Sequence, residues 1–368
     1  MLAGWRAVNR EPAITPWLWT GLFMGLGLLS KYTALFQLAC WAVFFCLWPQ
    51  ARRHLRFPGP WLALLVMAVC ALPILIWNAQ HGWVTVSHVA TNAKLDKPWE
   101  PTLRYFGEFI GAEAALLNPI FFVGIVWASL AFWKSHRHEP IFVFVFSMGA
   151  PLFLFYWLYS LHSRILPNWI APSVAPLFCL MALYWQRRRF GGWFIAALAI
   201  GLPMVILLHD TDMINRLTGN YLPAHIDPLR RVRGWSTTAQ EVNRARKALA
   251  QEGKEVFAIG AHYGITGEMS FYIPEAKAAV DNVPLVYYRS SGHAHNQFFF
   301  WPKYRDQRAG QNAIYVHEAE RRRPPPPQVL EDFESVESLG LRKIMYRGRE
   351  LRRIELFACR NLKPRSTK

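Results

Sequence analysis

Seven apolar stretches dominate the first 208 residues and limit what this part of the chain can fold into. They fall at about 16–30, 32–48, 59–77, 113–133, 140–160, 167–185 and 191–208. As helices, most of them are long enough to cross the hydrocarbon core of a bilayer, which is roughly 30 Å thick. A water-soluble domain seldom carries so much apolar sequence. We therefore expect residues 1–208 to form an all-α polytopic membrane bundle of about six or seven transmembrane helices.

The first two stretches are short and meet at Ser30-Lys31-Tyr32-Thr33. Two arrangements fit this pattern, namely two short spans joined by a tight turn or one long kinked span. Gly21, Gly25 and Gly27 give the first stretch a face of small residues. Such a face allows close packing against another membrane helix.

Acidic residues divide the chain near residue 209. Only six of the 24 acidic residues precede this point, and the other 18 follow it. Residues 209–368 read as a water-soluble segment in which predicted strands alternate with predicted helices, a pattern that indicates a small α/β domain. The expected strands are Glu255–Gly260, Leu285–Tyr288, Ala313–Val316 and Leu351–Ala358, and the expected helices are Thr237–Gln251 and Ile265–Tyr272.

Three short basic loops predict the orientation of the bundle. Residues 52–56, 134–138 and 187–189 are rich in Arg, Lys and His and lie between apolar stretches that alternate consistently. Basic loops of membrane proteins stay in the cytoplasm. We therefore expect a multi-pass protein of the bacterial inner membrane, with residues 209–368 on the periplasmic face together with loops 78–112 and 161–166.

The net charge of +17 raises the question of nucleic acid binding. Much of the positive charge in residues 1–208 belongs to the three basic loops, where membrane orientation explains it. Residues 209–368 hold 26 basic and 18 acidic residues, an excess of only +8. We therefore expect anionic lipid or a phosphorylated substrate as partner, and no nucleic acid.

The residues do not predict a metal centre or a cofactor. Four of the five cysteines lie in apolar stretches, so neither a disulfide framework nor a CxxC metal motif is present. His293 and His295 have chelating spacing, but no carboxylate or thiol lies near them in the sequence. We expect no metal ligand in this pair and leave a divalent ion at another position open.

Several short segments resemble one family of membrane enzymes. Gly25–Ala34, Pro73–Trp83 and Arg164–Pro172 are similar to segments of the polytopic bacterial glycosyltransferases related to dolichyl-phosphate-mannose–protein mannosyltransferases and to the lipid A aminoarabinose transferase. This is glycosyltransferase family 39, which has the GT-C fold. The same resemblance extends into the water-soluble half at Asp227–Trp235, Phe271–Pro274 and Asn296–Trp301.

The resemblance implies transfer of a sugar from a polyprenyl-phosphate carrier to a lipid, glycan or protein of the cell envelope. In this family, an acidic residue or pair associated with catalysis lies in a first outer loop near the amino end. We find no segment of this chain that corresponds to that loop. The resemblance therefore implies that this chain matches the carboxy-terminal part of such an enzyme, and that its catalytic residues are unknown.

Two groups of residues are candidates for the carrier-phosphate site. Lys31, followed by Tyr32, lies between two apolar stretches, and a cation in such a place suggests a function. Arg164, followed by Asn168 and Trp169, lies in a short outer loop, where a guanidinium suits a phosphate group. The plain alternatives are a snorkelling lysine that anchors a helix and an arginine that contacts lipid headgroups.

A third group marks the outer end of the stretch 59–77. Asn78, His81 and Trp83 follow it closely, and polar side chains at a helix end often line a cavity. We expect them to contact the sugar or the phosphate, with His81 also suited to proton transfer. The alternative for Trp83 is an anchor in the membrane interface, which is the commoner role of tryptophan there.

Glu108 and Glu113 are weak candidates for catalysis at the outer end of the fourth apolar stretch. Glu108 follows Arg104 by four residues, and an ion pair along one helix explains it. Glu113 enters the apolar stretch with no partner nearby in the sequence. A carboxylate is needed to deprotonate an acceptor hydroxyl.

Two other functions remain open at this point. The chain is a non-catalytic membrane partner, or the lipid-binding half of a split transferase, if another chain supplies the catalytic loop. A transporter or flippase is the second alternative. The scarcity of charge within the apolar stretches and the lack of an evident inverted repeat weigh against it.

Overall fold

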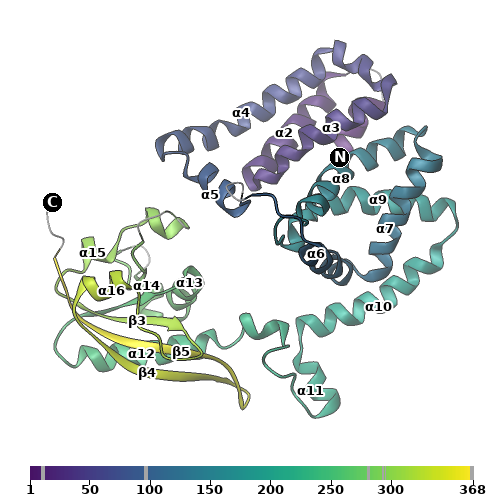
Figure 1. The fold of residues 1–368 in the computed structure, drawn as a ribbon. Helices are drawn as coiled ribbons and strands as arrows, with labels where there is room; N and C mark the ends of the chain where they lie inside the picture. Colours follow the sequence, from purple (N-terminus) through teal and green to yellow (C-terminus); the bar gives the residue numbers. More distant parts are fainter. Residues whose placement is uncertain (10–12, 95–97, 280–281, 292–293, 295, 365–368) are drawn as a thin grey trace. The chain divides into compact units, whose positions relative to one another are not determined.

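The computed structural model describes residues 1–9, 13–94, 98–279, 282–291, 294 and 296–364. The chain divides into two compact units, Met1–Met204 and Val205–Lys368. The first unit is helical, and the second is built around a β-sheet (Figure 1). We describe each unit by itself.

The helical unit contains the apolar helices expected of a membrane protein. Four helices of the described residues, Pro58–Gln80, Pro140–Tyr159, Pro167–Arg187 and Gly191–His209, are long and apolar enough to cross a bilayer, and the number rises to six if each of two bent helix pairs is one span. The expected membrane protein is thus confirmed, and the number of spans stays a prediction. The helices are α1 Leu2–Asn9, α2 Ile14–Ser30, α3 Phe36–Leu47, α4 Pro58–Gln80, α5 Val84–Asn92, α6 Leu103–Leu116, α7 Pro119–Ala131, α8 Pro140–Tyr159, α9 Ala171–Arg187 and α10 Gly191–His209.

The expected stretch 113–133 is not one continuous helix. It contains the end of α6 and the whole of α7, which meet at a bend of 111°. Asn118 at the break has a φ of 71°, and its side chain accepts a hydrogen bond of 3.0 Å from the N–H of Ile120. Pro119 then begins α7, a position that proline favours because it lacks an N–H to donate. This bend corrects the sequence-based expectation that Glu108 and Glu113 open the same helix as residues 119–131.

The glycines of α2 allow it to lie directly against α4. A Cβ atom on Gly21 would lie 2.3 Å from the carbonyl oxygen of Ala63, and one on Gly25 would lie 2.5 Å from the Cβ of Cys70. The small-residue face predicted for α2 is therefore confirmed at these two positions. Because later residues of α2 meet later residues of α4, the two helices run in the same direction.

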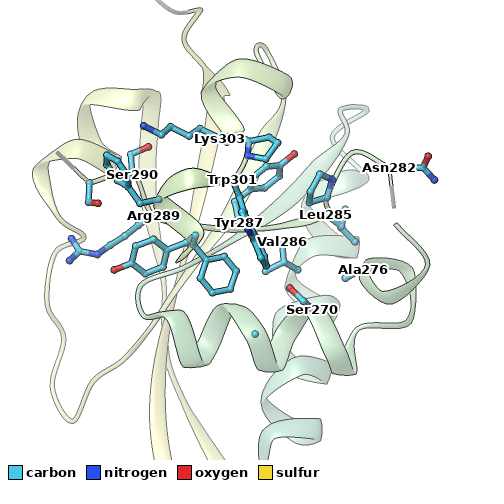
Figure 2. A pocket seen from close by; sticks show the side chains of 17 residues that line it. Ser270, Ala276, Asn282, Leu285, Val286, Tyr287, Arg289, Ser290, Trp301 and Lys303 are labelled. Atoms are coloured by element: carbon cyan, nitrogen blue, oxygen red, sulfur yellow. The ribbon is translucent and has the colours of Figure 1, made fainter. Parts of the chain in front are cut away.

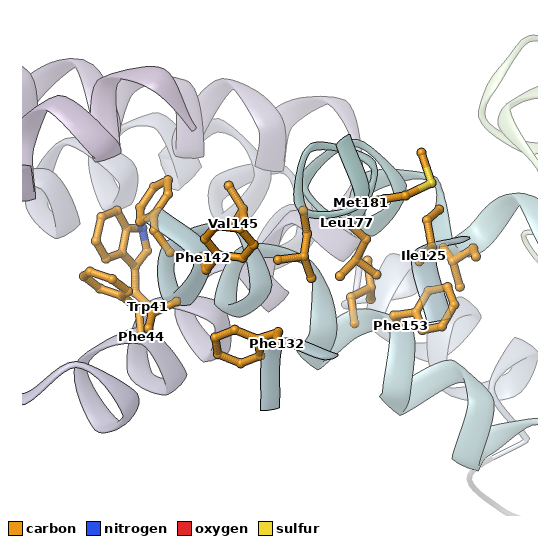
Figure 3. Packing of buried hydrophobic residues seen from close by; sticks show 14 of the residues in the cluster. Trp41, Phe44, Ile125, Phe132, Phe142, Val145, Phe153, Leu177 and Met181 are labelled. Atoms are coloured by element: carbon orange, nitrogen blue, oxygen red, sulfur yellow. The ribbon is translucent and has the colours of Figure 1, made fainter. Parts of the chain in front are cut away.

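Helices α3, α8 and α9 pack through a core of large apolar side chains (Figure 3). Phe36 at the start of α3 lies 4.9 Å from Phe155 near the end of α8, measured between ring centroids. Phe44 near the end of α3 lies 5.4 Å from Phe144 near the start of α8. The two helices are therefore antiparallel, and contacts from Gly149 to Leu177 show that α9 packs on α8 as well.

The second unit contains a five-stranded mixed sheet with strand order β2-β1-β3-β5-β4. Strands β2 and β3 pair in parallel with β1, and β5 pairs antiparallel with β3 and β4. The four predicted strands are confirmed, and β4 was not predicted. The strands are β1 Val256–Gly260, β2 Val286–Tyr288, β3 Asn312–Glu318, β4 Phe333–Tyr346 and β5 Arg349–Leu362.

Side chains of the central strands alternate between two apolar layers. Ala258 and Ile314 join the core beneath α12 (Trp235–Ala250) and α13 (Tyr263–Tyr272), whereas Phe257 joins the opposite core with residues of α15 (Tyr304–Gln307) and α16 (Pro327–Asp332). All five residues of β1 are buried because both faces of the sheet are covered. Two further short helices in this unit are α11 Asp212–Thr218 and α14 Pro274–Ala278.

Strand β4 escaped prediction because it lies at the edge of the sheet and most of its residues are not buried. An exposed edge strand lacks the apolar alternation that identifies a half-buried strand. Arg347 and Gly348, which join β4 to β5, both have positive φ angles, as a two-residue hairpin turn requires. In the sequence, Gly348 was a signal for this turn. Arg347 obscured the signal, because such turns favour Asn, Asp or Gly at that position.

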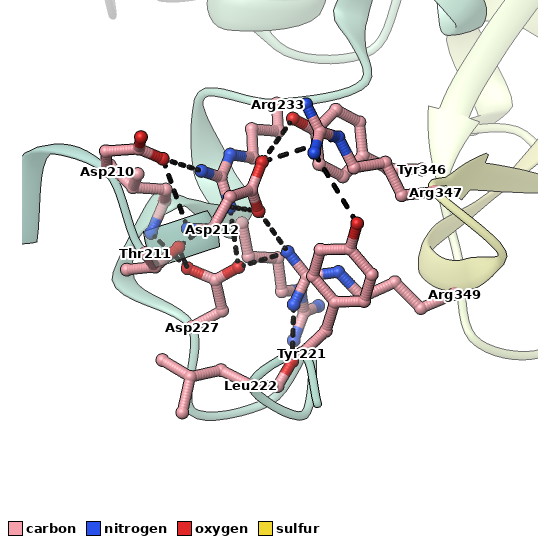
Figure 4. Close-up of polar contacts among 12 residues, drawn as sticks. Asp210, Thr211, Asp212, Tyr221, Leu222, Asp227, Arg233, Tyr346, Arg347 and Arg349 are labelled. Carbon is pink, nitrogen blue, oxygen red and sulfur yellow. Dashed lines mark hydrogen bonds and ion pairs between the residues drawn. The ribbon is translucent and has the colours of Figure 1, made fainter. Parts of the chain in front are cut away.

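A network of buried charges ties the start of the sheet unit to the β4–β5 hairpin (Figure 4). We call it the charge lock, and it is centred on the buried carboxylate of Asp227. Asp227 lies 3.1 Å from a guanidinium nitrogen of Arg233 and 2.8 Å from one of Arg349, and it accepts a 3.0 Å hydrogen bond from the hydroxyl of Thr211. Asp212 pairs with Arg233 at 3.2 Å. The lock therefore joins residues that are more than 100 positions apart in the sequence.

The partners of Asp227 hold its carboxyl group in the charged form. Burial raises the pKa of this carboxyl. The opposite effect is larger, and it comes from the N–H of Leu229, the hydroxyl of Thr211 and the guanidinium groups of Arg233 and Arg349. The net effect is a pKa below the ordinary value for aspartate. A folded-state pKa that is lowered contributes stability above the unfolded pKa, and this contribution is lost as the pH falls through the folded value.

The packing of α2 on α4 leads to the first prediction. Gly21→Ala places a methyl group against the backbone of Ala63, so the helices have to separate, at an expected cost of about 1–3 kcal/mol. The control is Gly111→Ala in α6, where nothing lies within 4 Å of the added Cβ. Thermal unfolding of the full chain in a neutral detergent should show a lower midpoint for Gly21→Ala only. Equal midpoints for the two variants would contradict the close packing.

The charge lock leads to the second prediction. Asp227→Asn removes a buried charge that faces two arginines, and we expect it to destabilise the sheet unit by about 3–5 kcal/mol at neutral pH. The difference from the unsubstituted chain should shrink as the pH falls below about 4, because protonation then removes the same charge from Asp227. Thermal unfolding at several pH values measures both effects, with Glu331→Gln on the exposed surface as the control. A difference that is independent of pH would show that the charge of Asp227 is not responsible.

Candidate functional site

The polar groups predicted from the sequence lie at one end of the helical unit. Phe36, just after Lys31 and Tyr32, packs on Phe155 and Tyr156 near the end of α8, and the loop 161–166 follows directly. Because α2 and α4 run in the same direction, the turn after α4 lies at this end too. The structure therefore brings together the ends of α2, α4 and α8, and we call this the polar end.

The three basic loops lie at the opposite end of the same unit. Glu139 at the start of α8 pairs with Arg187 at the end of α9 and lies 2.8 Å from the ring of His136. Trp17 contacts both Trp41 and His54, with ring centroids 5.3 Å and 6.1 Å apart, which places the 52–56 loop beside the end of α3. The antiparallel packing of α3 and α8 puts this end of α3 at the start of α8.

Lys31 is an exposed cation at the end of α2. Its backbone is extended, and its N–H caps α2 by donating to the carbonyl oxygen of Gly27 at 2.9 Å. Within the described part of the chain, the ammonium group forms no ion pair. Lys31 and the exposed ring of Tyr32 are therefore both accessible to a ligand.

Asn78 has a structural role that the sequence did not show. Its side chain is buried and donates to the carbonyl oxygen of Ile74 at 2.9 Å, and it accepts from the N–H of Thr85 at 3.2 Å. Since both ends of the amide bind backbone groups, Asn78 fixes the turn between α4 and α5.

His81 and Trp83 present aromatic rings on this turn. The ring of His81 stacks on that of Trp77 at 4.2 Å with an interplanar angle of 11°, and its Nδ1 lies 2.7 Å from the carbonyl oxygen of Trp77. Trp83 is half exposed and has a φ of 56°, an uncommon value for a bulky residue. Asn78 supports this conformation, because its carbonyl oxygen accepts the N–H of Trp83 at 2.8 Å.

Glu108 links two exposed arginines. One carboxylate oxygen lies 3.0 Å from Nε of Arg104, which confirms the predicted pair along α6. The other oxygen lies 3.2 Å from Nε of Arg164, in the loop after α8. The side chains of Arg104 and Arg164 are 78% and 74% exposed, so both guanidinium groups keep donors for a further anion. The pair with Arg164 was not predictable from sequence, because it joins residues 56 positions apart.

Glu113 is fully enclosed by the helical unit. One carboxylate oxygen accepts a hydrogen bond of 3.2 Å from the indole N–H of Trp157 in α8, and the other has no hydrogen-bond partner in the structure. The sequence indicated no local partner for Glu113, and the partner comes from another helix. An unpaired buried carboxylate oxygen is uncommon and suggests a functional role.

The polar end contains further aromatic contacts that were not predicted from the sequence. The ring of Trp99 stacks on that of His162 at 4.6 Å with an interplanar angle of 8°. Trp169, on the turn Pro167–Ile170, lies 5.8 Å from Tyr156, and the neighbouring Asn168 is exposed. In the sequence, the position of Trp99 in a polar loop could have indicated this aromatic contact.

The described residues provide no group of three His, Cys, Asp or Glu side chains that could hold a metal ion. His293 and His295, which have chelating spacing in the sequence, lie outside the described residues. The exposed side chains of the polar end include the cations Lys31, Arg104 and Arg164 and aromatic rings, which suit a phosphate group and a sugar ring.

A second cavity lies in the sheet unit, beside β2 (Figure 2). It encloses about 490 Å³ and is lined by aromatic residues and by Lys303. The ring of Phe298 lies 4.8 Å from Trp301 and 5.9 Å from Tyr288. The segment Asn296–Trp301, which carried part of the family resemblance, contributes three of the rings that line this cavity, those of Phe298, Phe299 and Trp301.

Comparison with known proteins supports the resemblance inferred from the sequence. Residues 1–77 match the model of the family described as dolichyl-phosphate-mannose-protein mannosyltransferase. This match covers about a fifth of the chain and shows that residues 1–77 are similar to that transferase family. The matched residues include Lys31 and Tyr32 and end one residue before Asn78.

A curated relative extends the similarity to this transferase family. The chain is 32% identical over 154 residues to the lipid A galacturonosyltransferase RgtD of Rhizobium johnstonii (strain DSM 114642 / LMG 32736 / 3841). The match covers 40% of this chain and 31% of the relative, so the chain spans about a third of that protein's length. No solved structure matches this chain.

The two hydrogen bonds of Asn78 lead to the third prediction. Asn78→Ala leaves a carbonyl oxygen and an N–H of the turn without these partners, and we expect a loss of stability of about 1–3 kcal/mol. Asn168→Ala, on the exposed turn, is the matched control. The measurement is the midpoint of thermal unfolding in neutral detergent. If Asn78→Ala unfolds at the same temperature as Asn168→Ala, Asn78 does not fix the turn.

Proposed function

We propose that this chain acts in a membrane glycosyltransferase, which transfers a sugar from a polyprenyl-phosphate carrier to a lipid, glycan or protein of the cell envelope. The observation that carries the proposal is the gathering of Lys31, Arg164 and the turn after α4 at one end of a helical unit whose first 77 residues match a transferase family. Similarity to a lipid A galacturonosyltransferase favours a lipid or glycolipid acceptor.

The distribution of charge supports a periplasmic location for the reaction. The loops 52–56, 134–138 and 187–189 lie at the same end of the helical unit, and basic loops face the cytoplasm. The polar end would then face the periplasm of a bacterial inner membrane. The sheet unit follows α10, and in this orientation it is a periplasmic domain.

The carrier phosphate would bind to the cations of the polar end. Lys31 has no carboxylate partner among the described residues, and Arg104 and Arg164 are held side by side by Glu108. Guanidinium groups bind phosphate through paired hydrogen bonds, and an ammonium group adds a compact charge. Apolar helices beside them offer a surface for the isoprenoid chain.

The aromatic rings of the same end would contact the sugar. His81 and Trp83 lie on the turn that Asn78 fixes, and Trp169 lies next to Tyr156. In this proposal Asn78 is a positioning residue, because its amide is already occupied by the backbone. Glu108 likewise positions the two arginines, and Glu113 is enclosed beside Trp157.

The fourth prediction tests the carrier site. Lys31→Ala and Arg164→Ala each remove a cation that binds the carrier phosphate, and we expect binding of a labelled polyprenyl-phosphate sugar to weaken about tenfold or more. Lys134→Ala, which removes a cation from the opposite end, is the matched control. Binding is measured with the full chain in neutral detergent, and sugar transfer is measured with membranes that contain it.

The two measurements separate the possible outcomes. Unchanged carrier binding in both Lys31→Ala and Arg164→Ala would contradict the carrier site. Binding without sugar transfer would contradict activity of this chain alone and would favour a lipid-binding partner of a second chain.

A further inference from the structure

The sheet unit contains a charged site of its own. Two cavities, of about 1080 and 830 Å³, share Arg230, Glu318, Arg352 and His225 in their lining. The two cavities adjoin at these shared residues, and we treat them together as one groove. We call it the arginine groove, and all of its residues belong to the sheet unit.

The larger part of the groove has a clear excess of positive charge. Its lining contains six arginines and three glutamates, a formal charge of +3. Arg353 pairs with Glu350, and Arg230 lies 4.0 Å from Glu318. Arg321 and Arg322, at the rim, are exposed and form no ion pair within the described part of the chain.

Arg352 supplies a buried positive charge at the wall of the groove. It is 5% exposed, and its guanidinium donates to the carbonyl oxygens of Arg230 and Arg233 at 2.7 and 2.6 Å. The guanidinium also lies 3.8 Å from the ring centroid of Trp235. Among the described residues no carboxylate lies within 4 Å of it, and its Nε has no hydrogen-bond partner. Burial lowers the pKa of this guanidinium, and the more distant charges of Glu318 and Glu268 oppose this shift without reversing it.

In the charge lock, buried arginines are neutralised by nearby aspartates. Arg233 lies within 4 Å of three aspartates, and Arg349 lies within 4 Å of two (Figure 4). Arg352, on the same hairpin as Arg349, has no such partner among the described residues. A buried cation with no carboxylate within 4 Å is costly, and an anionic ligand in the groove would reduce this cost.

The groove is held in shape by backbone contacts. The N–H of Arg323 donates to a carboxylate oxygen of Glu355 at 2.9 Å, which fixes the end of the Arg321–Arg323 run. Asp227 caps the turn that carries Arg230 by accepting from the N–H of Leu229 at 3.0 Å. Since the cations are positioned before a ligand arrives, binding loses little entropy.

We propose that the arginine groove binds the phosphate group of a membrane lipid headgroup. Several arginines around one cavity match a phosphate monoester or diphosphate, which offers several oxygens and more than one negative charge. Inorganic phosphate has the same chemistry, but the position of the groove in the chain favours a lipid. Only 15 residues lie between His209, at the end of apolar helix α10, and His225 in the groove. At about 3.5 Å per residue these span at most roughly 50 Å, so the chain tethers the groove within this distance of the end of α10.

The identity of this lipid as the sugar acceptor rests on the proposed function. In that case the groove would hold the acceptor by its phosphate, while Lys31 and Arg164 hold the carrier. Binding of a phosphorylated headgroup does not itself depend on sugar transfer, so the two proposals are tested separately.

The fifth prediction concerns binding of short-chain phosphatidic acid, a lipid with a phosphate monoester, to the full chain in neutral detergent at fixed salt concentration. The double substitution Arg321→Gln and Arg322→Gln removes two unpaired rim charges, and we expect binding to weaken about fivefold. The matched control is Arg188→Gln with Arg189→Gln, which also removes two consecutive arginines but from a basic loop of the helical unit. The control should bind phosphatidic acid as tightly as the unsubstituted chain.

The other probes identify the source of the phosphate. Short-chain phosphatidylcholine, which carries no net charge, should bind at least about fivefold more weakly than phosphatidic acid. Equal binding of phosphatidic acid to both double variants, or equal binding of the two lipids, would overturn the proposal. Inorganic phosphate that binds as tightly as phosphatidic acid would overturn the assignment to a lipid. Intact phosphatidic acid binding without sugar transfer would contradict the proposed function and leave the groove assignment in place.

Discussion

The antiparallel packing of α3 on α8 is the contact on which the arrangement of the helical unit depends. Phe36 meets Phe155 at one end, and Phe44 meets Phe144 at the other. This contact decides which loops share an end, because α3 follows the Lys31 turn and α8 precedes the Arg164 loop. In a bilayer such packing relies on close contact between side chains, since lipid tails are as apolar as the helices themselves.

The two ends of the helical unit differ in how their charged side chains are paired. At one end, Glu139 neutralises only part of the basic charge of the loops 134–138 and 187–189. At the polar end, Glu108 joins Arg104 to Arg164. The first arrangement is typical of membrane orientation, and the second leaves guanidinium donors free for an anion. In the proposed function, the first end orients the helical unit in the membrane and the second end binds the phosphorylated carrier.

The sheet unit uses buried charge in two different ways. In the charge lock, Asp227 lies between Arg233 and Arg349, so the network stabilises the junction between the connector and the β4–β5 hairpin. Arg352 on the same strand lacks a carboxylate partner among the described residues and lines a groove instead. The contrast between balanced and unbalanced arginines is the physical basis for assigning the groove to an anionic ligand.

Local features of this protein follow from the amino-acid sequence alone. The length of the apolar stretches predicted the membrane helices. The pattern of strands alternating with helices in residues 209–368 predicted four of the five strands. The separation of four residues between Arg104 and Glu108 predicted their ion pair. Each of these depends on residues that are close together in the chain. Other features are known only from the folded structure. The expected stretch 113–133 is broken at Asn118. Glu113 accepts a hydrogen bond from Trp157, and Glu108 pairs with Arg164. Folding also makes Asn78 a support for a turn, where a ligand contact was expected. Hydrogen bonds and ion pairs between distant residues leave no periodic pattern in a sequence, whereas apolar burial along one helix or strand does.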